Sequence, residues 1–132
     1  MEAEKIRKYW HLINSDDEFV LKAFYYYNLD HKSPFGLYNI YEIIKDDLKD
    51  KGYAELYDKK LNLRYCTKRE CKSFTNSVNS PEGVGLGNSR HASKSKKMSP
   101  KLKKMTVEEA GSFLNKIFWK WLEDKSESIK EN

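Results

Sequence analysis

Apolar residues recur at helical spacing along most of the chain, and this pattern predicts an all-α protein. The most regular stretch begins at Ser33-Pro34, where proline at the first helical position loses no hydrogen bond, and ends at Gly52, a natural C-terminal cap. We expect this helix to form the middle of the core together with the last helix of the chain. Its predicted inward positions are Leu37, Ile40, Tyr41, Ile44 and Leu48.

Three capping boxes predict where further helices begin. In a capping box, a Ser or Thr hydroxyl accepts the N–H of the third residue after it, and a Glu at that position reaches back to the N–H of the cap. The apolar spacing after the boxes predicts helices that end near residues 27, 78 and 124. The three boxes are Ser15-x-x-Glu18, Thr67-x-x-Glu70 and Thr106-x-x-Glu109.

The remaining segments are less regular. Residues 9–13 are predicted to be either a short strand or an apolar lead-in, and residues 53–63 to form a shorter helix. Residues 80–104 show no periodicity and are rich in Gly, Ser and Lys, so we expect a long flexible basic loop. Residues 125–132 are polar and expected to be a frayed tail. The predicted fold is therefore all-α, a single compact domain over residues 1–132 with about five helices and the basic loop before the last one.

The composition fits one small domain. A chain of 132 residues with 39% apolar and 34% charged residues can bury a lean core, which its 14% of aromatic residues help to fill. No apolar run approaches the ~20 residues that span a bilayer, and the charged N-terminus is not that of a signal peptide. We therefore expect a cytoplasmic protein without membrane contact.

The two cysteines, Cys66 and Cys71, are expected to be thiols. A reducing compartment would leave them unbridged, and a bridge across this spacing would have awkward geometry. Too few Cys and His residues stand nearby to bind zinc. We expect neither a metal nor a cofactor.

Positive charge is concentrated in one third of the chain. The net charge is +5, and residues 64–104 contain eleven Lys or Arg but only two acidic residues. This segregation favours a polyanion partner, because cations that neutralise phosphates supply most of the non-specific affinity for nucleic acid. The alternative is a solvated loop without a partner. The candidate nucleic-acid-binding residues of the loop are Arg90, Lys94, Lys96, Lys97, Lys101, Lys103 and Lys104.

A second group of cations lies on the helix that begins at Thr67. A short helix, a break and then this helix resemble a helix-turn-helix, in which Lys68, Arg69 and Lys72 would face outward and contact DNA. The connection is long for that motif. The alternative interpretation is therefore an ordinary pair of helices with exposed lysines.

Arg90 and His91 are the candidate catalytic residues. A histidine titrates near pH 6.5 and can shuttle protons, and an adjacent arginine can bind a phosphate through two hydrogen bonds. Together they would form a metal-independent ribonuclease site; the alternative is an ordinary polar pair in a loop. The glycines of residues 83–87 predict a flexible turn, because Asn88 stands where a G-x-G-x-x-G motif needs its third glycine.

Other polar and aromatic residues receive structural interpretations. The acidic pairs at residues 16–17 and 46–47 are expected at a helix start and on a solvated helix face. His11 and His31 are expected to be surface or packing residues. The tyrosines at 25–27 cannot all face one side of a helix, so at least one ring should be exposed, and Tyr25 or Trp119 would serve a protein partner.

Four stretches combine a polar Arg/His loop with a threonine-capped, aromatic last helix. They are Leu37-Tyr38-x-x-Tyr41-Glu42-x-Ile44, Phe74-x-Asn76-x-x-Asn79-x-Pro81, Arg90-His91-Ala92 and Met105-Thr106-Val107-Glu108-Glu109-Ala110. Over about two thirds of its length the chain thereby resembles small bacterial helical proteins of the HEPN and abortive-infection C-terminal kind.

This resemblance implies a dimeric helical protein linked to phage defence or toxin–antitoxin systems. Many such proteins are metal-independent ribonucleases, whose catalytic Arg precedes the His by four to six residues on a helix. Arg90 instead abuts His91. What the resemblance implies here is therefore an inactive or binding version, or a related family of unknown role.

Three functions from different classes remain open. The first is a nucleic-acid-binding module, for RNA in preference to DNA, that uses residues 64–104. The second is a protein-interaction or dimerisation domain without nucleic acid. The third is a metal-independent HEPN-like endoribonuclease, so whether the chain is an enzyme stays open, with binding alone favoured.

Overall fold

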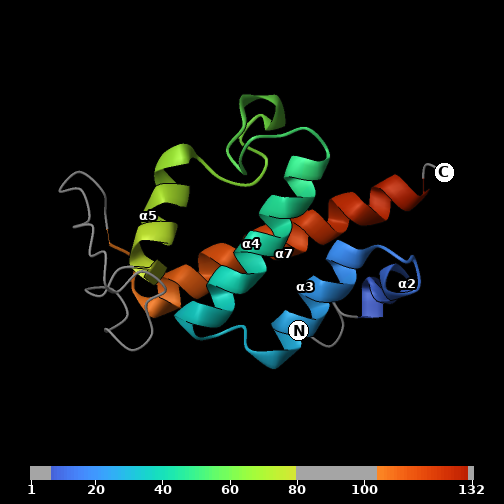
Figure 1. Cartoon of the computed structure of the whole chain (residues 1–132), viewed down its shortest axis with the longest axis horizontal. Coiled ribbons are helices and arrows are strands. Elements are labelled where there is room, and N and C mark those ends of the chain that lie inside the picture. The colour runs from blue at the N-terminus through green and yellow to red at the C-terminus, as the bar shows by residue number, and fades with distance from the viewer. Residues whose placement is uncertain (1–6, 80–103, 131–132) are drawn as a thin grey trace.

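Two long helices, α4 (Pro34–Asp50) and α7 (Val107–Lys130), cross at the centre of the molecule (Figure 1). α3 (Glu18–Leu29) follows the short helix α2 (Trp10–Ile13) and packs along one side of α4, and α5 (Lys68–Asn79) lies on the other side against α4 and α7. This computed structural model describes residues 7–79 and 104–130. Within them the chain is helical and has no strand, which confirms the predicted all-α fold of about five helices.

Helix α4 begins after Ser33 and ends just before Gly52, as the sequence predicted. The Ser33 hydroxyl accepts the N–H of Gly36 at 3.1 Å, and Pro34 stands in the first turn. Glycine is required at position 36, because a Cβ there would lie 2.1 Å from the carbonyl oxygen of Asp30. At the other end, Gly52 has a φ of +98°, which glycine adopts without steric strain.

Two of the three predicted capping boxes are present. The N–H of Thr67 donates to the Glu70 carboxylate at 2.9 Å, and the N–H of Glu70 donates to the Thr67 hydroxyl at 3.1 Å. Thr106 and Glu109 make the same two bonds at the same distances. These reciprocal bonds fix the first residues of α5 and α7.

The capping box predicted at Ser15 is wrong. Residues 10–13 already form α2, rather than a strand, and the Ser15 hydroxyl donates to the carbonyl of Leu12 at its end. Asp17 caps α3 instead, with a carboxylate oxygen that accepts the N–H groups of Phe19 at 3.0 Å and Val20 at 3.2 Å. Asp17 therefore lies at a helix start, as expected, but it takes the capping role that was predicted for Ser15.

The helix predicted over residues 53–63 is also wrong. The chain there makes successive turns and one 3-10 turn, η1 (Lys59–Leu61). The Asp58 carboxylate stabilises the turns by accepting the N–H groups of Ala54 and Lys60, each at 2.9 Å. Asn62 then adopts a left-handed φ of 49°, which breaks a right-handed helix. A helix-turn-helix is therefore excluded here, because its first helix is missing.

Aromatic rings fill much of the core. Phe118 of α7 stacks on Tyr27 of α3, with ring centroids 4.5 Å apart. Tyr27 is buried whereas Tyr25 is 63% exposed, which confirms that the tyrosine run exposes a ring. Trp119 is half-buried and stacks on Tyr9 at 6.0 Å, so this ring packs against the core rather than projecting toward a partner as predicted.

α7 continues to Lys130, through residues expected to fray. Lys125 and Ser126 are buried, and the Ser126 hydroxyl lies 3.1 Å from Nε2 of His11. The predicted frayed tail is therefore wrong for residues 125–130, which continue the helix, and the contacts of Lys125 with Asp17 and of Ser126 with His11 stabilise the start of this stretch. None of the described helices is long and apolar enough to cross a membrane.

Candidate functional site

The outward face of α5 carries three cations in its first half. The inward face buries Phe74 and Val78, and the one acidic residue of the helix, Glu70, is bound to the capping N–H of Thr67. The second half of the outward face is neutral and can form hydrogen bonds. From the start of the helix to its end, the outward side chains are Lys68, Arg69, Lys72, Thr75 and Asn76.

The basic segment between α5 and α7 is attached at both ends to the same end of α5. It leaves from Asn79, and it returns at Met105, whose N–H donates to the Ser77 hydroxyl at 2.8 Å. Residues 80–103 contain six Lys or Arg and one acidic residue, whereas the described residues contain 18 basic and 16 acidic ones. The described residues are thus nearly neutral, and the excess positive charge lies in residues 80–103, which follow Asn79 of α5 and precede the Met105 that is bonded to Ser77 of the same helix.

Most of the predicted site residues lie in that segment, outside the residues that the structure describes. They include the candidate catalytic pair, Arg90 and His91. The four described candidates, Lys68, Arg69, Lys72 and Lys104, are all exposed. The predicted binding residues that lie outside are Arg90, Lys94, Lys96, Lys97, Lys101 and Lys103.

A surface hollow of about 620 Å³ lies between α5 and α7. Phe113 and Met105 line it together with the cations Arg69 and Lys116. Three glutamates also line it, at positions 70, 108 and 109. Their carboxylates repel phosphate, so we expect phosphate contacts on the side of α5 that carries Lys68 and Lys72 rather than in this hollow.

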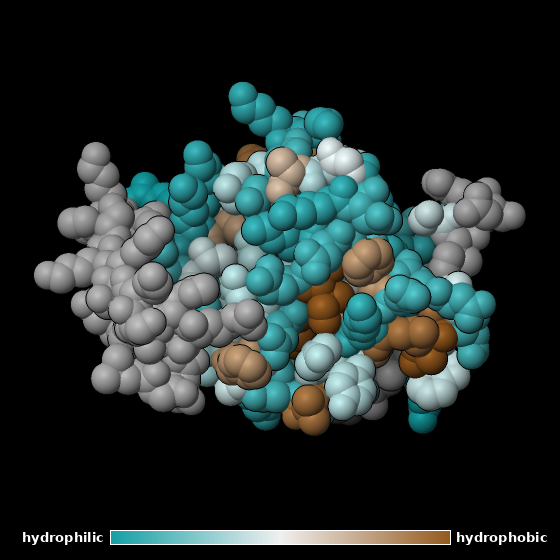
Figure 2. Space-filling view, in the orientation of Figure 1, coloured by the Kyte–Doolittle hydropathy of each residue, from teal (hydrophilic) through white to brown (hydrophobic). Residues whose placement is uncertain are grey.

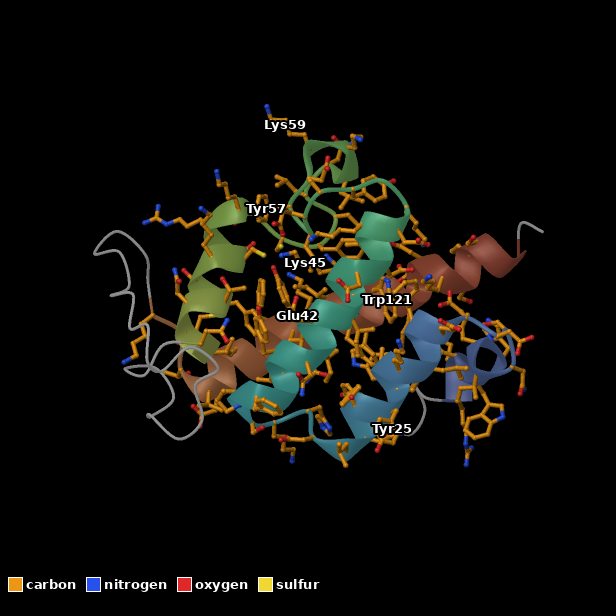
Figure 3. The ribbon with its side chains drawn as sticks, in the orientation of Figure 1. Tyr25, Glu42, Lys45, Tyr57, Lys59 and Trp121 are labelled. Carbon is orange, nitrogen blue, oxygen red and sulfur yellow. The ribbon has the colours of Figure 1, made fainter. Side chains whose placement is uncertain are left out.

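Two thiols and a tyrosine meet between α4 and α5. Cys66 and Cys71 are free thiols, as predicted; both are buried, and they are hydrogen-bonded to each other. The Tyr41 hydroxyl lies 2.9 Å from the Cys71 sulfur. Cys71 also borders a hollow of about 260 Å³. Lys45 and Tyr57, which line the same hollow, lie between α4 and α5 (Figure 3).

The two thiols differ in acidity. The hydrogen bond from Cys66 lowers the pKa of Cys71, burial opposes this, and the Tyr41 hydroxyl lowers the pKa of Cys71 further. The same hydrogen bond, with burial, raises the pKa of Cys66. Burial also raises the pKa of Tyr41, so its hydroxyl keeps the proton that it donates. Cys71 is therefore the more acidic thiol, and thiolate is the reactive form of cysteine.

Lys125 of α7 is enclosed by carboxylates from two other parts of the chain. Its Nζ lies 2.7 Å from Asp17 Oδ2 and 2.6 Å from Asp47 Oδ1. Asp47 is buried, and its other oxygen accepts the indole N–H of Trp121 at 2.8 Å. The prediction that this residue faces solvent is therefore wrong; only its neighbour Asp46 is exposed. In Figure 3, Trp121 lies on the side of α4 opposite Lys45, toward α3.

Lys125, Asp17, Asp47 and Trp121 form the Lys125 cluster, in which hydrogen bonds favour the charged forms of Asp17 and Lys125. Burial acts to raise the pKa of Asp17, but hydrogen bonds from Lys125 and two backbone N–H groups outweigh it, and the pKa is lowered. Burial acts to lower the pKa of Lys125, but its bonds to both carboxylates outweigh that and the pKa is raised. The cluster joins α3, α4 and α7, which is a structural role.

Sequence reasoning missed both buried clusters. A signal for the Lys125 cluster was present, because Lys125 follows Trp121 by four residues and Asp47 follows Ile44 by three, which places each polar side chain on a buried helix face. Cys71 was likewise in register with the core. Cys66 lies before the helix, so no periodicity marked its position.

Comparisons of the chain with protein-family models, with curated protein sequences and with solved structures found no significant match. The resemblance to HEPN and abortive-infection C-terminal proteins therefore stays a prediction. Among the residues that the structure describes, no group of three or more His, Cys, Asp or Glu side chains is placed to hold a metal ion.

Proposed function

We propose that the protein binds nucleic acid, RNA in preference to DNA, through the outward face of α5 and the basic segment attached to it. One observation carries the proposal: three exposed cations share one helix face, and both ends of a segment with six more are anchored at that helix. Cations concentrated in one helix face and in the segment that follows it in the sequence attract a polyanion. A cytoplasmic location would give access to RNA.

The side chains of α5 suit a single strand of RNA. Lys68 and Lys72 are one helical turn apart, so their Cβ atoms are about 5–6 Å apart and their long stems can reach neighbouring phosphates. Arg69, which borders the acidic hollow, adds positive charge to the same helix face. Thr75 and Asn76 can bond to the 2′-hydroxyl groups that distinguish RNA from DNA.

Binding is tested by titrating the protein into fluorescently labelled single-stranded RNA in EDTA, at about 50 mM and about 200 mM salt. We expect affinity to fall steeply as salt rises. Replacing the α5 cations with Gln should weaken binding on the order of tenfold and reduce the salt slope by about two. The variant carries Lys68→Gln, Arg69→Gln and Lys72→Gln.

A matched control has the same loss of charge on exposed lysines elsewhere, namely Lys22→Gln, Lys49→Gln and Lys59→Gln. Equal weakening in both variants would mean that net charge alone drives binding. No binding of the unmodified protein at low salt would contradict the proposal. A DNA strand of the same sequence tests the preference for RNA, and cleavage that His91→Ala removes would show a ribonuclease.

A second candidate function, a protein-interaction or dimerisation domain, is favoured by the exposed apolar residues of α3. Leu21, Tyr25 and Leu29 follow one another at intervals of four residues and are 39%, 63% and 65% exposed. Figure 2 shows apolar side chains exposed over α2 and α3. Light scattering over a range of concentrations tests this function; a stable dimer that Tyr25→Lys converts to a monomer would support it.

A further inference from the structure

We propose that Cys66 and Cys71 form an oxidation site for small hydroperoxides, in which Cys71 is the thiol that attacks the peroxide and Cys66 the thiol that resolves the product into a disulfide. The inference is independent of nucleic-acid binding. It rests on three features in one place: two thiols in contact, a hydroxyl donor on one of them, and a hollow that reaches that same thiol.

The hollow favours a small oxidant. Cys71 is 1% exposed and borders a hollow of about 260 Å³, so a small hydroperoxide reaches its sulfur more readily than a peptide disulfide such as oxidised glutathione. Tyr38, Tyr57, Lys72 and Thr75 line it beside the Lys45–Glu55 ion pair, so it is polar enough to hold a hydroperoxide.

Contacts around Cys71 favour its thiolate. The Tyr41 hydroxyl lies 2.9 Å from the Cys71 sulfur, the hydrogen bonds of Cys71 with Cys66 and Tyr41 lower its pKa, and Lys45 adds a positive charge nearby. Glu55 acts in the opposite direction and is partly neutralised by its ion pair with Lys45 at 3.5 Å. A thiolate of this kind is the nucleophile that peroxides oxidise.

The reaction balances without a metal or a second oxidant. The Cys71 thiolate attacks one peroxide oxygen, so an S–O bond forms while the O–O bond breaks and Cys71 becomes a sulfenic acid; the departing hydroxide takes up the proton that the Cys71 thiol released to solvent when it ionised, which gives the first water. The Cys66 sulfur then attacks the Cys71 sulfur; the S–S bond forms, the S–O bond breaks, and the leaving hydroxide takes the Cys66 proton. Two thiols are oxidised, and one peroxide is reduced to two waters.

Closure of the disulfide must disturb the start of α5. The two sulfurs must approach to about 2.05 Å, and the Tyr41 hydroxyl loses its thiolate acceptor. The four residues between the cysteines include both partners of the capping box, Thr67 and Glu70. We therefore expect the oxidised protein to have a weakened first turn of α5.

The experiment treats the reduced full-length protein with hydrogen peroxide, blocks remaining thiols with N-ethylmaleimide and measures the intact mass and the peptide map. The expected product is lighter by two hydrogen atoms, contains a Cys66–Cys71 linked peptide, takes up no maleimide and is restored by dithiothreitol. It should form on the order of ten times faster in the folded protein than in the same protein unfolded in urea.

Variants separate the two thiol roles. Cys66→Ser should accumulate a sulfenic acid on Cys71, trapped by dimedone, whereas Cys71→Ser should leave Cys66 unoxidised. Tyr41→Phe keeps the ring but removes the donor, so the pH profile of the oxidation rate should shift to higher pH and the rate at neutral pH fall about tenfold. Circular dichroism shows that each variant is folded before it is tested.

Three results would overturn the proposal. The first is full maleimide uptake after peroxide treatment, and the second is a disulfide that forms no faster in the folded protein than in urea. The third is oxidation that yields only crosslinked dimers or only a sulfinic acid on Cys71, since either would exclude Cys66 as the resolving thiol.

Discussion

Lys125 and the lysines of α5 are the same residue type in opposite settings. Lys125 is 7% exposed and contacts two carboxylates, whereas Lys68 and Lys72 stand in solvent. Both kinds count equally in the net charge of +5. The comparison shows that net charge does not tell how much positive charge a partner can reach, because the charge of Lys125 is used inside the protein.

The two settings differ in energy because water screens one and not the other. Removal of an ammonium group from water is costly and is offset only by well-placed partners. Around Lys125 the charges balance, since Lys51 also lies 3.6 Å from Asp47 Oδ2. Two positive and two negative groups thus neutralise one another. Loss of one of these groups leaves a buried charge without its counterion, whereas loss of an exposed lysine does not.

The largest effect is expected from Lys125→Met. This change keeps an apolar stem but leaves the buried carboxylate of Asp47 without its main counterion, and it should lower the free energy of unfolding by about 3–5 kcal/mol. Urea unfolding followed by circular dichroism measures it. Lys116→Met, on an exposed part of the same helix, is the control and should cost less than about 0.5 kcal/mol. Equal effects would remove the distinction between the two settings.

The free energy of unfolding should depend on pH through the same cluster. The pKa of Asp17 is below its ordinary 3.8, so its contribution is present above that value and is lost as pH falls through the lowered pKa. The pKa of Lys125 is above its ordinary 10.5, so its contribution is present below that value and is lost as pH rises through the raised pKa.

The difference in stability between the unmodified protein and Lys125→Met should therefore be constant over the neutral range and shrink at both extremes. Urea titrations of the two proteins in parallel, from strongly acidic to strongly alkaline pH, measure this difference. A difference that changes near pH 7 would mean that another group controls the cluster.

A smaller effect is expected from Trp121→Phe. The indole N–H that Asp47 accepts at 2.8 Å is lost and part of the buried ring volume with it, which should cost about 2 kcal/mol. Trp119→Phe is the control, because this half-buried ring retains its stacking on Tyr9 after the change. Equal costs in thermal or urea unfolding would show that the indole bond adds nothing beyond packing.

The smallest effect on stability is expected from the triple Gln variant of the α5 cations. Lys68, Arg69 and Lys72 are exposed, so their replacement should change the free energy of unfolding by less than about 0.5 kcal/mol. If binding to RNA falls while stability holds, the two sets of cations differ as proposed. A large loss of stability would mean that the α5 cations serve the fold.

Local features of the sequence predicted much of the fold. The sequence predicted the capping boxes at Thr67 and Thr106 and the bounds of α4. Each of these features depends on residues only three or four positions apart, so it is visible in the sequence itself. The helix predicted over residues 53–63 was wrong because the Asp58 carboxylate accepts backbone N–H groups there, and the spacing of apolar residues does not reveal such bonds. The capping box predicted at Ser15 was wrong because α2, which was not predicted, ends just before this residue.

The candidate sites likewise include features that the sequence could predict and contacts that it could not. The outward position of Lys68 and Lys72 follows from helical period alone. The contact of Tyr41 with Cys71 joins residues 30 positions apart, and that of Asp47 with Lys125 joins residues 78 apart. Neither contact could be predicted without knowledge of how α4 packs on α5 and α7.

The bond between Asp17 and Lys125 spans 108 positions, and it has a consequence for synthesis on the ribosome. At 5–20 residues per second, Asp17 is made on the order of ten seconds before its partner exists. Throughout that interval α3 and α4 lack the helix that covers their apolar faces, so the nascent chain is a natural client for chaperones. The protein can complete its core only after nearly all of α7 has been translated. A slow codon late in the message would therefore prolong the time for which these apolar faces are uncovered.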